Sequence, residues 1–94
     1  MTKMLKSSYD EAIDTYMVHF GASNISGRRT VAHSKSVGGF AGDPHVGGFG
    51  TDVLYDLVPA IEDAQAFAST LGLTVLREHH LNGDHLQPSD WVND

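Results

Sequence analysis

The stretch of residues 52–77, DVLYDLVPAIEDAQAFASTLGLTVLR, decides the fold that the sequence predicts. In its middle part, apolar residues recur three and four positions apart, which predicts a helix over about 59–71. Pro59 suits the first turn, where its missing N–H is not needed, and Gly72 is a natural left-handed stop. The apolar stripe of this helix consists of Ile61, Ala64, Ala68 and Leu71, with Phe67 beside it.

Two strands are predicted beside this helix. Apolar and polar residues alternate over 52–57, and branched apolar residues dominate 73–77. The order strand, helix, strand predicts that the two strands pair in a parallel or nearly parallel way through a right-handed crossover.

Residues 8–22 fit both a helix and a strand. Ser8 and Glu11 form a Ser-x-x-Glu capping box, which favours a helix. The apolar residues at helical spacing are Ile13, Tyr16, Met17 and Phe20. The alternation over 16–22 favours a strand instead. We expect a short helical turn near 8–14 and a strand near 15–22. A hairpin turn at 24–27 would then lead into a weaker edge strand at 28–37.

These elements predict an α+β fold, with the 94 residues forming one small domain. A three- to four-stranded mixed or antiparallel sheet would pack on one main helix, and a long glycine-rich loop would span 38–50. Segments 1–7 and 86–94 are expected as flexible or docked tails. The sequence shows no signal peptide and no apolar run of roughly 20 residues that could cross a membrane.

The charge of the chain is strongly acidic in its second part. The formal net charge is −6, and residues 37–94 carry nine acidic residues against one arginine. Such a chain repels the phosphate backbone, so direct binding of duplex nucleic acid is not expected. An acidic surface attracts a basic one, which points to a protein partner with a basic surface. The plain alternative is that the acidity serves solubility.

The segment 38–50 holds six of the ten glycines. The tetrapeptide VGGF occurs twice here, beginning at residue 37 and again at residue 46. The segment lacks the Lys-Ser/Thr of a phosphate-binding loop and the GxGxxG of a dinucleotide site. One interpretation is an adaptable protein-binding loop in which Phe40 and Phe49 are apolar anchors. The other is an irregular hairpin with both phenylalanines folded onto the core.

Histidines cluster near the end of the chain. The sequence HHLNGDH places three imidazoles and a carboxylate within seven residues, and these types are ligands of zinc or nickel. The candidate metal ligands are His79, His80, Asp84 and His85. Neither HxxxH nor HExxH occurs, and Asn82-Gly83 is typical of a turn. Because the chain has no cysteine, thiolate sites and disulfides are excluded.

The last residues contain Trp91, the one tryptophan of the chain. If the Trp91 side chain is buried on the core, it docks this tail. If Trp91 is exposed beside Asp90, the tail would instead be a recognition peptide for a basic, apolar groove.

The sequence therefore predicts a non-enzymatic, cytoplasmic, acidic interaction protein without a cofactor, acting as an inhibitor or adaptor that occludes a basic surface. Phage and mobile-element inhibitors, such as anti-CRISPR and anti-restriction proteins, share this size and charge. The expected partner-binding residues are Phe40, Phe49, Asp43, Asp52, Trp91 and Asp90. The alternative is a histidine-based metal or small-anion binding protein. The edge strand expected at 28–37 could also pair with that of a second copy, so a homodimer is a further alternative.

Overall fold

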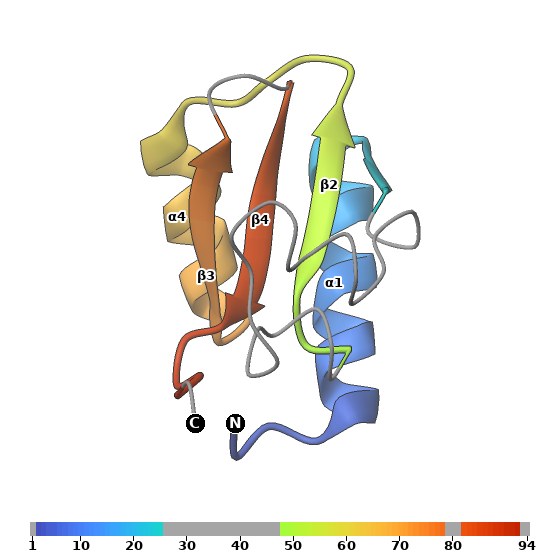
Figure 1. Cartoon of the computed structure of the whole chain (residues 1–94). Helices are drawn as coiled ribbons and strands as arrows, with labels where there is room; N and C mark the ends of the chain where they lie inside the picture. The colour runs from blue at the N-terminus through green and yellow to red at the C-terminus, as the bar shows by residue number, and fades with distance from the viewer. Residues whose placement is uncertain (1, 26–47, 79–81, 93–94) are drawn as a thin grey trace, which may run out of the picture.

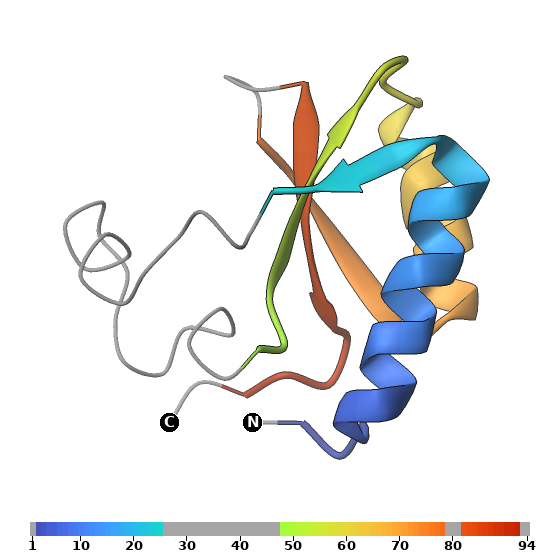
Figure 2. The same ribbon diagram turned by 90° about the vertical axis from the view of Figure 1, so that its right-hand side faces the viewer.

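The structure, a computed structural model, describes residues 2–25, 48–78 and 82–92 (Figure 1). These residues form an α+β domain in which both helices cover the same face of a four-stranded antiparallel sheet (Figure 2). The sheet has the strand order β1-β2-β4-β3. The elements are α1 (Lys6–Phe20), β1 (Ala22–Asn24), β2 (Thr51–Tyr55), α4 (Ile61–Thr70), β3 (Leu73–Glu78) and β4 (Gly83–Pro88). The predicted fold class is confirmed.

The elements predicted within 52–77 are present. The helix α4 buries Ala64 and Ala68 against the sheet and carries Glu62 and Asp63 in its first turn, where the helix dipole favours negative charge. It ends just before Gly72, whose φ of 76° lies in the left-handed region. The strands β2 and β3 lie on either side of it in the sequence.

The predicted direct pairing of these two strands is wrong. β2 and β3 run in the same direction, but β4 lies between them and is antiparallel to both (Figure 1). Residues 86–88 therefore belong to a central strand rather than to a tail. The sequence of β4, GDHLQP, has no β-branched residue, so propensity gave no sign of a strand.

The N-terminal segment is one continuous helix, so the strand predicted near 15–22 is wrong. α1 begins after Leu5 rather than at Ser8, and it ends at Gly21, whose φ is 64°. The helical pattern prevails because it buries one continuous stripe against the sheet, made of Tyr9, Ala12, Ile13 and Tyr16.

The short strand β1 follows Gly21 and pairs with β2. The predicted turn at 24–27 lies only partly within the described residues, where Asn24 ends β1. The predicted edge strand at 28–37 and most of the glycine-rich segment lie outside them.

The core lies between the two helices and the sheet and contains three tyrosines. The Tyr9 hydroxyl bonds to the Thr51 hydroxyl (2.6 Å) and donates to the Leu86 carbonyl (3.2 Å). Tyr16 and Tyr55 bond to each other through their hydroxyls. Each buried phenol therefore has a polar partner, which offsets the cost of its burial. The buried apolar residues are Tyr9, Ala12, Ile13, Tyr16, Val53, Tyr55, Ala64, Ala68, Leu73, Val75 and Leu86.

Candidate functional site

Exposed carboxylates gather on the two helices. α1 presents Glu11 and Asp14, and α4 presents Glu62 and Asp63. None of the four forms an ion pair within the described residues, unlike Asp10, which pairs with Lys6 on the first turns of α1. We call these four residues the acidic helix layer. Carboxylates without a neighbouring cation create a negative potential over the helices.

A groove of about 450 Å³ lies between the two helices, and Asp14 is the carboxylate in its lining. Its lining residues are Asp14, Thr15, Val18, His19 and Phe67. Val18 is 84% exposed, and the His19 ring stacks on Phe67 with 3.8 Å between ring centroids. On α4, Asp63 precedes Phe67 by four residues and so lies on the same stripe of the helix. This interhelical groove therefore combines the apolar side chains of Val18 and Phe67 with the carboxylate of Asp14.

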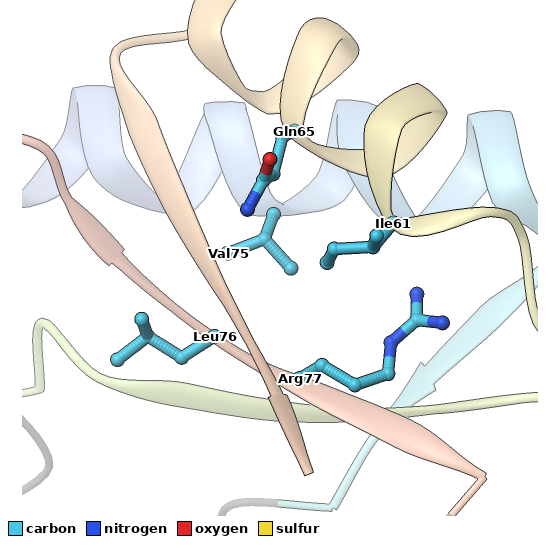
Figure 3. Close-up of a pocket in the computed structure, with 5 residues that line it drawn as sticks. All are labelled: Ile61, Gln65, Val75, Leu76 and Arg77. Atoms are coloured by element: carbon cyan, nitrogen blue, oxygen red, sulfur yellow. The ribbon is translucent and has the colours of Figure 1, made fainter. Parts of the chain in front are cut away.

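A second groove of about 500 Å³ lies on the other side of α4, next to β3 (Figure 3). In Figure 3, the Gln65 and Ile61 side chains extend from α4 toward β3, whose Arg77 side chain reaches toward the start of the helix. The lining residues of this edge groove are Ile61, Gln65, Val75, Leu76 and Arg77.

The positive charge of Arg77 is balanced inside the protein. Its Nε donates to Asp84 Oδ1 (2.7 Å), and Nη2 donates to Asp84 Oδ2 (3.1 Å) and to the Pro59 carbonyl (2.9 Å). The Tyr55 hydroxyl donates to the same carboxylate at 2.7 Å. The hydrogen bond with Asp84 raises the pKa of Arg77 above its ordinary value, so the guanidinium stays charged. This network is structural and leaves the edge groove without a free cation.

The helix-free face of the sheet carries a histidine–carboxylate pair. His85 Nδ1 lies 3.2 Å from Asp52 Oδ1, and Nε2 lies 2.9 Å from Gln87 Oε1. His85 and Asp52 are directly opposite each other on β4 and β2. An Asp–His pair can move a proton, but here both ring nitrogens are occupied by side-chain oxygens and both residues are buried. The pair is an interaction across two strands, and nothing in it identifies a reaction.

The predicted metal ligands do not converge where the structure describes them. Successive residues of a strand point to opposite faces, and Asp84 contacts Arg77 on the helix side whereas His85 contacts Asp52 on the other side. One ion cannot be held by both. His79 and His80 lie outside the described residues. Among the described residues, no three His, Asp or Glu side chains form a metal-binding group. The metal alternative remains a prediction without a structural observation in its favour.

The predicted partner-binding residues are engaged within the molecule where they are described. Phe49 is partly buried and packs between the Tyr9 ring (5.4 Å between centroids) and the Trp91 ring (6.0 Å). Trp91 is also partly buried. This contact favours the docked interpretation of both aromatic residues over exposed anchors.

The two acidic members of that set that the structure describes, Asp90 and Asp52, have internal partners as well. Asp90 accepts hydrogen bonds from the Thr2 hydroxyl and from the Lys3 backbone N–H (3.0 Å), and the bond from Thr2 lowers its pKa below the ordinary value. Asp52 is paired with His85. Phe40 and Asp43 lie outside the described residues.

The acidic helix layer was missed by sequence reasoning, although a signal for half of it is present. If residues 8–22 are taken as one helix, Glu11, Asp14, Thr15 and Val18 follow each other at three, one and three positions and share one outer stripe. The expected strand over 15–22 separated these residues and concealed the stripe.

Comparison of the chain with protein-family models, curated proteins and solved structures found no match. Within residues 2–25, 48–78 and 82–92, neither helix is both long and apolar enough to cross a membrane.

Proposed function

We propose that this chain is a non-enzymatic acidic interaction protein, an inhibitor or adaptor that occludes a basic surface of a macromolecular partner. The observation that carries the proposal is the acidic helix layer beside the interhelical groove. Its four exposed carboxylates have no ion-pair partner among the described residues, and one of them, Asp14, lines the groove together with Val18, an apolar side chain that is 84% exposed.

The two parts of this surface serve different steps of association. Unpaired carboxylates attract a basic partner over about 10 Å at 0.1 M salt, which raises the association rate. Once contact is made, an apolar patch that loses its water supplies affinity and slows dissociation. Val18 and the Phe67 floor of the groove are suited to that second step.

The proposal predicts a partner whose binding depends on salt and on these carboxylates. A quantitative pull-down from a lysate of the organism that encodes the chain, or of its host, would compare the wild type with Glu11→Gln/Asp14→Asn and with Glu62→Gln/Asp63→Asn. We expect one basic partner to be recovered stoichiometrically by the wild type. Recovery should fall about tenfold with each double variant and with a rise from about 50 to about 500 mM salt.

A matched control changes the net charge by the same amount elsewhere. Ser23→Lys/Asn82→Lys also adds two positive charges, at exposed positions in β1 and just before β4 rather than on the helices. It should retain the partner nearly as well as the wild type does. If recovery of the partner falls equally with all three double variants, only the net charge matters and not the position of the carboxylates. Binding unchanged by salt would contradict the electrostatic account.

A further inference from the structure

The strand β3 lies at one edge of the sheet, with β4 on one side and no strand on the other among the described residues (Figure 1). Its six residues, Leu73–Glu78, pair along their whole length with β4. The outer edge is therefore as long as an average strand of a globular protein.

The register determines which backbone groups of β3 point outward. The N–H of Ser89 bonds to the carbonyl of Gly72, so in this register residues 74, 76 and 78 exchange hydrogen bonds with β4. The alternate residues Leu73, Val75 and Arg77 direct their N–H and C=O groups away from β4. These three residues present a row of donors and acceptors to an incoming strand.

Within the described residues, β3 itself lacks the lysines, prolines and bulges that usually prevent such pairing. Natural edge strands carry outward lysines, prolines or bulges. β3 contains neither lysine nor proline, and the side chain of its Arg77 is turned to Asp84. On the helix-free face, Leu76 is 52% exposed. The edge groove runs beside the strand, with Ile61 and Gln65 of α4 as its second wall (Figure 3).

The charges around the groove indicate what would occupy it. Glu62, in the first turn of α4, precedes the groove residue Gln65 by three positions and so shares its stripe of the helix, and Arg77 adds no net charge because it is paired with Asp84. An extended segment with lysine or arginine would therefore be attracted, whereas a second copy of this chain, with its own net charge of −6, would be repelled.

We propose that β3 binds an extended basic segment of the partner as an added strand, with alternate side chains of that segment entering the edge groove. Main-chain hydrogen bonds to Leu73, Val75 and Arg77 supply affinity in this mode, and the pocket and charges supply selectivity. The inference rests on the proposed function and names how the basic partner is held.

The test uses a ten-residue peptide of alternating lysine and valine as the probe. Backbone amide hydrogen exchange of the full chain, followed by NMR, would be measured with and without the peptide. The amides of Leu73, Val75 and Arg77 should exchange rapidly in the free protein and at least about tenfold more slowly when it is bound. The amides of Thr74 and Leu76 should be protected in both states, because they bond to β4.

Matched peptides and variants separate strand addition from general attraction. An alternating glutamate and valine peptide, and a Lys–Val peptide with N-methyl groups on alternate amides, should each bind about tenfold more weakly. Gln65→Trp, which fills the groove, should weaken binding about tenfold. Ala66→Trp, at the next exposed position of α4 and outside the groove lining, should bind as the wild type does.

Each contrary outcome has a separate meaning. Salt-dependent binding of the Lys–Val peptide without protection at the three amides would overturn strand addition and leave the proposed function in place. Failure of the peptide to bind would overturn the inference, and the pull-down with the acidic-helix-layer variants would then decide the proposed function independently. Protection of the three amides in the free protein, together with a concentration-dependent molecular mass, would show that a second copy occupies the edge.

Discussion

The carboxylate of Asp84 lies in the interior of the protein, fully buried between the helices and the sheet. Burial of a charge is costly unless its partners supply hydrogen bonds in good geometry. Arg77 supplies two and Tyr55 a third. Removal of the carboxylate would leave a guanidinium and a phenol without their acceptor.

We expect Asp84→Ala to lower the free energy of unfolding by about 3–5 kcal/mol, because it breaks a buried pair and leaves one charge uncompensated. Urea denaturation followed by circular dichroism measures this loss. Asp63→Ala, at an exposed position of α4, is the control and should cost less than about 1 kcal/mol. If the two variants lose the same free energy of unfolding, the buried pair of Asp84 and Arg77 contributes no more to stability than an exposed carboxylate does.

The role of Asp84 could be predicted from the sequence only in part. Asn82-Gly83 was identified as a turn, but Gly83 is the first residue of β4 and pairs with Glu78, and this register places Arg77 opposite Asp84. Without the strand β4 that pairing was not apparent, and the neighbouring histidines suggested a metal ligand instead. The hydrogen bond from Tyr55 depends on β2 packing beside β4, which no local pattern encodes.

At the scale of elements, the contact between β2 and β4 depends on a residue without a side chain. A Cβ placed on Gly83 would lie 2.2 Å from the Val53 carbonyl oxygen, which is too close for any atom pair. The next step of the ladder is the bond from the Tyr55 N–H to the Asn82 carbonyl, at 2.7 Å. A methyl group at Gly83 must therefore push the two strands apart where β4 begins.

We expect Gly83→Ala to cost about 1–3 kcal/mol of stability and to speed hydrogen exchange at the Tyr55 amide, since the strands separate there. Gly21→Ala is a useful comparison, because its cost of about 1–2 kcal/mol comes only from the left-handed backbone, with no atom near the added methyl group. In Gly21→Ala, exchange at the Tyr55 amide should speed up only as much as the loss of global stability requires. Unchanged Tyr55 exchange in Gly83→Ala would contradict the close-approach argument.

Local sequence patterns identified the elements that satisfy one simple periodicity. The helix α4 combines helical spacing with a glycine stop, whereas Pro59, predicted in its first turn, lies before the N-cap Ala60. The strands β2 and β3 follow from alternation and from branched apolar residues. α1 was divided because its aromatic and branched residues at 16–22 also alternate, and only the packing of Tyr9 and Tyr16 on the sheet decides between the two patterns. β4 was missed because its buried polar residues are stabilised by partners from other strands. The grooves on either side of α4 arise from that packing and so were not predictable.

At the scale of the whole molecule, all three tyrosines of the chain are buried in one core. Burial raises the pKa of Tyr9 to about 12, and it raises the pKa of Tyr16 and of Tyr55 as well. The folded state therefore holds these phenol protons more tightly than the unfolded state, whose tyrosines titrate near 10.

The contribution of the tyrosines to the free energy of unfolding should therefore not change with pH below about 10, and it should fall as the pH rises further. The expected slope is about 1.4 kcal/mol per pH unit for each tyrosine that is protonated in the folded state and ionised in the unfolded state. Absorbance at 295 nm, which detects tyrosinate, should rise in one cooperative step together with the loss of the circular dichroism signal. Tyrosinate that forms near pH 10 in the folded protein would show that these phenols are accessible to solvent.

The hydrogen bonds that Thr2 and Lys3 make to Asp90 hold residues 2–3 and residue 90 together at one pole, while the start of α4 lies at the opposite pole (Figure 1). An anchor attached at either end would therefore hold the molecule in the same orientation. On a sensor surface, both versions would turn Glu62 and Asp63 toward the solution, and the choice of tag would not alter which side meets an incoming partner.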